Sequence, residues 1–196
     1  MAERKATVTR ETKETSVKVE LNIDGKGQFE ITTGIRFFDH MLSQMAQHGI
    51  FDMKLSATGP DQHHVVEDVA ISLGKAFNQA LGDKLGIVRM AHALVPMDEA
   101  LAIVALDIGG RGYTVFEASF GNSSIDKMPA DLVRHFFLSF ASESKLNIHA
   151  KVMSGINDHH KAEALFKALA RALDAATRLD QRLAGKIPST KDTIEK

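Results

Sequence analysis

The stretch "HHVVED" (63–68) starts a segment of helical periodicity, and 96 positions later the chain reads "HHKAEA" (159–164). Each stretch places two adjacent histidines three residues before a glutamate. In each case the apolar residues that follow recur at the three- and four-residue spacing of a buried helix face. The same polar element at two helix starts indicates that the fold contains an internal repeat.

Other polar and glycine positions keep this register. The matching pairs are His63–His159, His64–His160, Glu67–Glu163 and Gly59–Gly155 at 96 positions and His40–His135 at 95. Matches among apolar residues arise easily by chance, whereas polar and glycine matches in one register do not. We therefore predict two similar halves, approximately residues 1–92 and 93–185. No linker rich in Pro, Gly or Ser separates them, so we expect one compact domain over residues 1–196.

Hydrophobic periodicity predicts the same element order in each half. The first half offers strands at 17–23 and 28–32, a helix at 38–49, a strand at 51–57 and a helix at 66–77; the second offers strands at 100–108 and 111–120, a helix at 131–141, a strand at 146–154 and a helix at 161–176. The dipeptide Asp24-Gly25 predicts a hairpin turn between the first two strands. Each half reads β-β-α-β-α, which predicts an α+β fold with helices packed between or against sheets.

Composition excludes several classes of protein. The net charge of −1 offers no overall field for nucleic acid or an anionic membrane. The chain contains no apolar run of the roughly 18 residues that span a bilayer, and its N-terminus lacks the apolar stretch of a secretory signal. We therefore expect a cytoplasmic protein without nucleic-acid or membrane partners. Because there is no cysteine, imidazole and carboxylate are the strong metal ligands available.

The spacing of the histidines suits metal ions. On a helix, Glu67 can share an ion with either His63 or His64, whereas adjacent histidines diverge by about 100° and can serve two different ions. Two sites of three imidazoles and one carboxylate could be built from His40, His63, His64, His135, His159, His160, Glu67 and Glu163. Such mixed nitrogen and oxygen sites favour Mn, Fe, Co, Ni or Zn over Mg or Ca.

The alternative is that these histidines are ordinary solvated or helix-capping residues. A single copy of the pattern favours that interpretation, and the second copy in register favours metal. His48 by itself is typical of a helix end, where the dipole favours a cation. His92, in an expected loop, and His149, on an expected strand, have no sequence partners, so we interpret both as structural.

Seven segments spread over nearly the whole chain form a combination typical of one family. They are "RETKETSV" (10–17), "FFDHMLSQMAQHGIFD" (37–52), "HHVVEDVAISLG" (63–74), "MDEAL" (97–101), "DIGGRGY" (107–113), "NDHHKAEALFKALARAL" (157–173) and "PSTK" (188–191). By these segments the chain resembles the imidazoleglycerol-phosphate dehydratases of histidine biosynthesis. The resemblance implies two halves of ribosomal-protein-S5-domain-2-like type. It also implies trimers that assemble into a 24-subunit shell.

By this resemblance, each active site holds two manganese ions at a subunit interface. One ion would be bound by His40, His64, Glu67 and His160, and the other by His63, His135, His159 and Glu163. Each set draws ligands from both halves of the chain. A lone subunit would therefore hold incomplete sites, and assembly would be obligatory for activity.

The reaction implied is loss of water from imidazole glycerol phosphate to give imidazole acetol phosphate. The departing hydroxyl is not β to a carbonyl, so the ring must accept the electrons. Metals on both ring nitrogens would stabilise an imidazolate that expels the hydroxyl through a diazafulvene-like intermediate. Glu14 and Glu163 are candidate general bases, and His48 and Asp98 could handle the hydroxyl or orient groups. The sequence does not rank them, and Glu14 alone reads equally well as an exposed strand charge.

The resemblance also nominates residues for the substrate and its phosphate: Glu14, Gln44, Arg89, Arg111, Lys167, Ser189 and Lys191. From the residues themselves, only "GGRG" (109–112) and "PSTK" suggest anion binding, through close backbone approach and the planar guanidinium. Taken alone, both segments are more typical of ordinary turns.

Two other functions fit the same ligands. A dinuclear metallohydrolase would use them to activate water, and a non-catalytic module would use the ions only to join subunits. Activity on imidazole glycerol phosphate and inhibition by triazole compounds would distinguish the dehydratase from the hydrolase.

Overall fold

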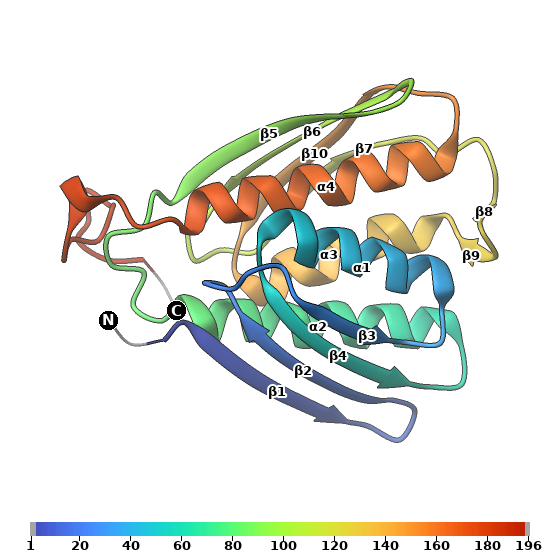
Figure 1. Ribbon diagram of the computed structural model, residues 1–196, viewed down its shortest axis with the longest axis horizontal. Helices are drawn as coiled ribbons and strands as arrows, with labels where there is room; N and C mark the ends of the chain where they lie inside the picture. Colours follow the sequence, from blue (N-terminus) through green and yellow to red (C-terminus); the bar gives the residue numbers. More distant parts are fainter. Residues whose placement is uncertain (1–2, 195–196) are drawn as a thin grey trace.

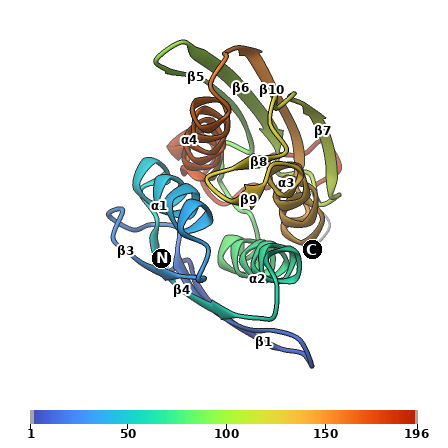
Figure 2. The ribbon, with the colours of Figure 1, turned by 90° about the vertical axis from the view of Figure 1, so that its right-hand side faces the viewer.

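Two four-stranded sheets enclose a layer of four helices (Figures 1 and 2). The computed structural model describes residues 3–194. In Figure 2 the helices lie side by side between the sheets, with α1 beside α4 and α2 beside α3. This is the mixed α+β arrangement that the sequence predicts.

The first half forms one sheet and two helices. Its elements are β1 (Lys5–Glu11), β2 (Ser16–Asn22), β3 (Phe29–Thr32), α1 (Arg36–Gly49), β4 (Asp52–Thr58) and α2 (Gln62–Leu81). The strand order is β1-β2-β4-β3. Neighbouring strands run antiparallel except β3 and β4, which run parallel because α1 crosses between them.

The second half repeats this topology. Its elements are β5 (Met90–Met97), β6 (Ala100–Asp107), β7 (Tyr113–Glu117), α3 (Asp131–Ser144), β10 (Asn147–Ser154) and α4 (Asp158–Thr177). The order β5-β6-β10-β7, with β7 parallel to β10, matches the first sheet strand for strand. The second half adds a small hairpin, β8 (Ser124–Ile125) with β9 (Met128–Pro129), and is followed by a 3-10 turn, η1 (Gln181–Leu183). The duplication is confirmed.

The predicted order β-β-α-β-α was one strand short in each half, because β1 and β5 were missed. Both are edge strands with weak alternation. The inward positions of β1 include Arg10, and β5 has exposed Met90 and Leu94 on its outer face and Pro96 near its end. A proline is tolerated on an edge strand, but in a sequence it argues against predicting a strand.

The predicted hairpin at Asp24-Gly25 was also wrong, because β4 lies between β2 and β3. The turn rests against β4 instead of returning along β2. The Asp52 carboxylate accepts hydrogen bonds from the backbone amides of Lys26 (2.8 Å) and Gln28 (3.1 Å). A Cβ on Gly25 would lie 2.3 Å from the Asp52 nitrogen, so only glycine permits this approach.

Both halves contribute to one hydrophobic core between the sheets. Alternate residues of β2, such as Val17 and Val19, point inward and are fully buried. Phe136 lies at the centre of the aromatic residues, with its ring near those of Phe38, Phe140 and Phe166. These contacts join α1, α3 and α4 across the repeat.

All four helices begin at the same end of the molecule, on the right of Figure 1. The last turns of the chain, around η1, lie at the opposite end. Residues early in the helices therefore gather at one end of the fold. Among residues 3–194, no helix has the length and hydropathy needed to span a membrane.

Candidate active site

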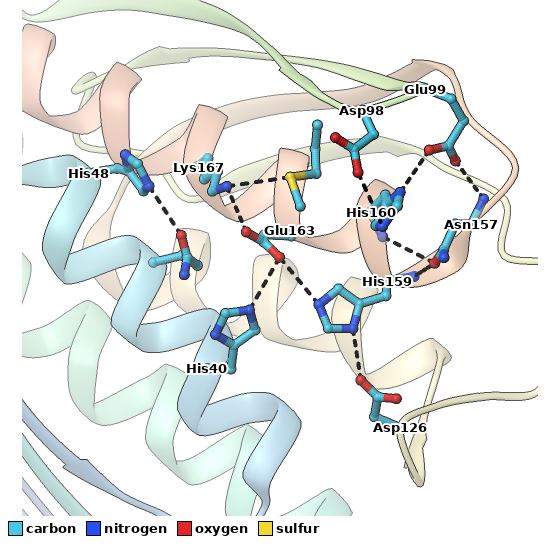
Figure 3. Close-up of polar contacts among 12 residues, drawn as sticks. His40, His48, Asp98, Glu99, Asp126, Asn157, His159, His160, Glu163 and Lys167 are labelled. Carbon is cyan, nitrogen blue, oxygen red and sulfur yellow. Dashed lines mark hydrogen bonds and ion pairs between the residues drawn. The ribbon is translucent and has the colours of Figure 1, made fainter.

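Three side chains from α1 and α4 converge at the end of the molecule where the helices begin (Figure 3). The Glu163 Oε2 atom lies 3.2 Å from His40 Nε2 and 3.2 Å from His159 Nε2. One ligand atom from each residue lies within 4.8 Å of the others, a spacing that could hold a metal ion. We call His40, His159 and Glu163 the α1–α4 cluster.

Glu163 is buried, and its charge is stabilised by cationic and polar neighbours. Burial opposes ionisation, but the hydrogen bonds from Lys167 and His40 outweigh it, and the pKa of Glu163 lies below its usual value. Lys167 Nζ is 2.6 Å from Glu163 Oε1. A carboxylate held ionised in this way is a good metal ligand and a weak proton acceptor.

A second cluster of the same composition lies between α2 and α3. It contains His63, Glu67 and His135, again with ligand atoms within 4.8 Å of one another. The rings of His63 and His135 stack with centroids 4.7 Å apart. His135 Nε2 is buried without a hydrogen-bond partner among the described residues, although Glu67 Oε1 lies 3.5 Å away. An unpaired buried nitrogen that faces a carboxylate is well placed to accept a metal ion.

The internal repeat interchanges these two clusters. Advancing His63 and Glu67 by 96 positions gives His159 and Glu163, and His40 corresponds to His135. Each cluster takes one histidine of a pair and the glutamate from one half and its remaining histidine from the other. We call His63, Glu67 and His135 the α2–α3 cluster.

The second histidine of each pair points toward a hairpin tip. His64 Nε2 lies 3.4 Å from Glu14 Oε2, at the turn between β1 and β2. His160 Nε2 lies 3.7 Å from Asp98 Oδ2, at the turn between β5 and β6. Glu14 and Asp98, two of the three candidate acid–base carboxylates, thus occupy equivalent places in the repeat.

Three further carboxylates, which the sequence reading missed, fix imidazole orientations. Asp61 Oδ2 lies 2.6 Å from His64 Nδ1, Glu99 Oε2 lies 2.7 Å from His160 Nδ1, and Asp126 Oδ2 lies 2.8 Å from His159 Nδ1. A carboxylate that accepts the Nδ1 proton leaves Nε2 free for a metal ion. Asp61 could have been found as the N-cap of α2, but Asp126 sits on the β8–β9 turn and gave no signal in the sequence.

These ion pairs also shift the titration of the groups involved. The Asp61 hydrogen bond raises the pKa of His64, and the Glu99 hydrogen bond raises that of His160. The pKa of Glu99 falls to about 2, through its bond to His160 and through the backbone amides of Asn157 and Ile156. The carboxylates beside the histidine pairs provide negative charge that favours the binding of cations.

His48 and Gln44 lie farther along α1, and their side chains are paired. His48 Nε2 is 3.1 Å from Gln44 Oε1. Burial, together with the positive charges of Lys167 and Arg171, lowers the pKa of His48. The lowered pKa favours the neutral imidazole, whose ring nitrogens can donate one hydrogen bond and accept another.

The nominated phosphate ligands fall in two places. Gln44 and Lys167 lie on α1 and α4, whereas Arg89, Arg111, Ser189 and Lys191 line one pocket formed with the C-terminal segment. That segment lies at the end of the molecule opposite the helix starts (Figure 1). One chain therefore does not bring the pocket and the clusters together.

Arg89 and Arg111 differ in their surroundings. Arg89 Nε and Nη2 bind the two Asp107 oxygens at 2.7 and 3.0 Å, and Nη1 donates to the Pro188 carbonyl at 2.7 Å. Arg111 is exposed, and no ion pair of it is found within the described residues. Arg89 is thus already committed to holding the C-terminal segment, and Arg111 is free to meet an anion.

His92 and His149 belong to neither cluster. His92 lies in β5 and not in the expected loop, and His149 lies in β10 as expected. Both side chains are exposed on the outer face of the second sheet, where they line a shallow pocket.

Comparison with known proteins gives one family. The sequence model of that family, described as imidazoleglycerol-phosphate dehydratase, matches residues 33–173. Curated proteins with this name include one from Dehalococcoides mccartyi (strain CBDB1), 59% identical over 195 residues that cover 100% of both chains. Another, from Chloroflexus aurantiacus, is 55% identical over 97% of this chain and 95% of its own.

Two solved structures share the fold. Imidazoleglycerol-phosphate dehydratase from Staphylococcus aureus N315 aligns with a TM-score of 0.83 and 32% identity, covering 90% of this chain and 99% of its own. The enzyme from Pyrococcus furiosus, in complex with (S)-C348, aligns with a TM-score of 0.83 and 33% identity, covering 95% and 100%.

Proposed function

We propose, from the premise that this chain belongs to the imidazoleglycerol-phosphate dehydratase family, that its two histidine–glutamate clusters are the two halves of a dinuclear metal centre. The chain is a hydro-lyase of histidine biosynthesis that acts on imidazole glycerol phosphate. The observation that carries the proposal is the interchange of the α1–α4 and α2–α3 clusters by the internal repeat.

The proposed centre holds two manganese ions. One is bound by His40, His64, Glu67 and His160, and the other by His63, His135, His159 and Glu163. Each ion would take two ligands from the α1–α4 side and two from the α2–α3 side of the fold. The donor set supports this assignment, because imidazole and carboxylate suit manganese and the carboxylates at Nδ1 leave Nε2 atoms free.

The division of ligands supports assembly through unlike surfaces. If the α1–α4 side of one subunit faces the α2–α3 side of the next, both ions gain four ligands. Such a head-to-tail contact forms a ring when the rotation between neighbouring subunits closes. We propose that it closes here as a trimer, and that trimers assemble into the 24-subunit shell.

The proposed chemistry uses the substrate's ring as the electron sink. Cations bound to the ring nitrogens would stabilise negative charge on the ring while the hydroxyl leaves. Glu14 is the favoured general base for the neighbouring carbon, because it is half-exposed beside His64 at 3.4 Å. Glu163 is better suited to metal binding, since its pKa is lowered and Lys167 already contacts it.

The two remaining candidate groups, Asp98 and His48, are assigned to the departing hydroxyl. Asp98 occupies the place equivalent to Glu14 beside His160, and His48 has a lowered pKa that keeps it neutral at pH 7. We propose that these groups orient the hydroxyl by hydrogen bonding as it leaves as hydroxide. The proton that Glu14 removes from the neighbouring carbon balances that loss, so the net change is the loss of one water. The product enol then tautomerises to the ketone of imidazole acetol phosphate.

The phosphate is proposed to bind at Arg111, Ser189 and Lys191, in the pocket that Arg89 shapes through Pro188. This pocket lies opposite the helix starts, so it would serve a metal centre built with neighbouring subunits. Gln44 and Lys167, on the helices of the α1–α4 cluster, are proposed to contact the substrate from the metal side.

The test is metal removal and replacement. Chelated protein should lose dehydratase activity and should regain it with Mn²⁺, while Mg²⁺ should fail because the sites are rich in imidazole. Assembly size followed by light scattering should change in parallel. Hydrolysis of phosphate or amide substrates without dehydration would favour the metallohydrolase. Disassembly on chelation, with no activity in any metal form, would favour the non-catalytic module.

Two broader assignments are also proposals. A single domain with a repeat boundary near residue 92 is supported by the core that both halves share. A cytoplasmic location is supported by the biosynthetic role of the family.

A further inference from the structure

The turn that carries Glu14 is held to α2 by the buried carboxylate of Asp68, which has no role in the proposed reaction. Asp68 is 7% exposed and follows Glu67 in α2. Its Oδ1 accepts a hydrogen bond from Arg10 Nε at 2.8 Å, and its Oδ2 accepts a short hydrogen bond from the Thr15 hydroxyl. Arg10 and Thr15 stand on either side of the turn, so Asp68 holds both of its ends.

The turn is also braced from within. The Thr12 hydroxyl accepts hydrogen bonds from the backbone amides of Glu14 (3.1 Å) and Thr15 (2.9 Å). The Thr12 amide donates to the Thr15 carbonyl at 2.9 Å. The backbone of Glu14 is thereby fixed relative to Thr15, and Thr15 is fixed relative to α2. The position of Glu14 follows from that of Asp68.

Close packing presses the same turn onto α2. A Cβ on Gly59 would lie 2.7 Å from Val65 Cγ2 and 3.0 Å from Thr15 Cγ2. The absence of a side chain at Gly59 therefore lets Thr15 approach the first turn of the helix. This contact does not involve Asp68, so it independently indicates that the position of the turn is set by α2.

The second half holds its own hairpin tip in the same place by different chemistry. Residue 164, which corresponds to Asp68, is alanine. Instead, Glu99 in the β5–β6 turn accepts hydrogen bonds from the amides of Ile156 (3.0 Å) and Asn157 (2.8 Å) at the start of α4. Both halves thus tie the turn that carries an acidic residue, Glu14 or Asp98, to the helix that carries a histidine pair.

We infer that Asp68 is a positioning residue for Glu14. It holds the turn so that the Glu14 carboxylate stands beside His64 Nε2, on the same helix that supplies His63 and Glu67. Asp68 touches none of the candidate metal ligands through its side chain, whereas Glu99 contacts His160 directly, so Asp68 allows the cleaner test. The inference rests on the proposed role of Glu14 as general base.

The experiment compares Asp68→Asn with Glu14→Gln and with the double variant, all in the manganese-loaded assembly. A displacement of about 1 Å at a catalytic group costs up to roughly 100-fold in rate. We therefore expect Asp68→Asn to lower kcat by about 10- to 100-fold, with unchanged KM and manganese content. The double variant should be no slower than Glu14→Gln alone. Amide hydrogen exchange at residues 12–15 should be faster in Asp68→Asn.

Asp52→Asn is the matched control, because Asp52 also ties a turn to a strand but lies away from the clusters. It should leave kcat unchanged. If Asp68→Asn fails to fold, Thr15→Val removes the hydroxyl that reaches Asp68 while keeping the side-chain shape, and the same results are expected.

The inference is overturned if Asp68→Asn keeps wild-type kcat, or if it slows Glu14→Gln by the same factor as it slows the wild type. If Glu14→Gln itself keeps full activity, the proposed role of Glu14 fails. The exchange rates at residues 12–15 then still decide whether Asp68 fixes the turn.

Discussion

Glu163 and His40, which are 123 positions apart in the sequence, meet with Oε2 3.2 Å from Nε2. The contact joins α4 of the second half to α1 of the first. Glu67 and His135 stand in the same relation between α2 and α3, with Oε1 3.5 Å from Nε2. Because the repeat interchanges these pairs, each helix pair of the fold carries one half of the candidate metal centre.

Because Glu163 and Glu67 are equivalent in the repeat, we predict that removing either carboxylate reduces metal binding and turnover to a similar extent. Glu163→Gln and Glu67→Gln should each reduce bound manganese and lower kcat by at least 100-fold, because each removes the carboxylate from one cluster. Metal content after dialysis and steady-state turnover measure this. Glu143→Gln, on α3 and 3.9 Å from Lys75, serves as the control and should change neither. Full manganese loading in either cluster variant would contradict the assignment.

We predict that Asp126 affects metal affinity through its contact with His159. Asp126→Asn removes the carboxylate 2.8 Å from His159 Nδ1 and weakens the selection of the tautomer with Nε2 free. Loss of such an outer partner typically lowers metal affinity by about 10- to 100-fold. Titration of chelated protein with Mn²⁺ measures the affinity. Glu117→Gln, which removes an exposed partner of Lys151, is the control. An unchanged affinity would show that Asp126 does not orient the ring.

Stability should depend on pH through Asp158, which is buried at the start of α4. Burial opposes its charge, but hydrogen bonds from the Gly121 amide, Lys161 and Asn122 outweigh this and hold the pKa well below the usual 3.8. A lowered folded pKa means that the stabilisation is present above pH 3.8 and is lost as pH falls below it. Asp158→Asn should therefore cost about 2 kcal/mol at pH 7 and progressively less below pH 4.

Urea unfolding at pH 7, 5, 4 and 3 measures this difference between variant and wild type. Glu20→Gln is the control, since Glu20 also has a lowered pKa but forms an exposed pair with Lys18. Exposed pairs contribute little to stability. If Asp158→Asn lowers the free energy of unfolding by the same amount down to pH 3, the charge of Asp158 is not what stabilises its contacts with Gly121 and Asn122.

The two arginines of the C-terminal pocket should separate binding from stability. Arg111→Ala should raise KM for the phosphorylated substrate at least 10-fold without changing the melting temperature, because Arg111 is exposed. Arg89→Ala should lower the melting temperature, because it leaves Asp107 and the Pro188 carbonyl without their donor. Kinetics and thermal melts of both variants test this. Equal effects on KM and stability would refute the distinction.

Local patterns predicted most of the elements but not their pairing. The alternation of Val17, Val19 and Leu21 indicated β2, and helical spacing indicated all four helices. The edge strands β1 and β5 were not predicted, because one face of each strand carries both polar and apolar residues. The Asp24-Gly25 turn was misread because a dipeptide does not report which strand lies across from it.

In the candidate site too, local patterns predicted some of the residues, and others depended on tertiary contacts. The two "HHxxE" stretches and their register were visible in the sequence, because helical spacing and offsets are properties of the chain itself. Asp61 and Glu99 lay inside or beside recognised segments but were not assigned as partners of His64 and His160. Asp126 was invisible because its contact with His159 depends on where the β8–β9 turn folds.

The sequence by itself determined that the fold is duplicated and which histidines and glutamates share a helix face, since spacing along a helix sets direction. Only the tertiary structure decided that His40 meets Glu163 and His135 meets Glu67, because those contacts depend on which helices pack together. It also placed the arginine pocket at the far end from both clusters. Such distances are set by the packing of helices between sheets, which no local pattern encodes.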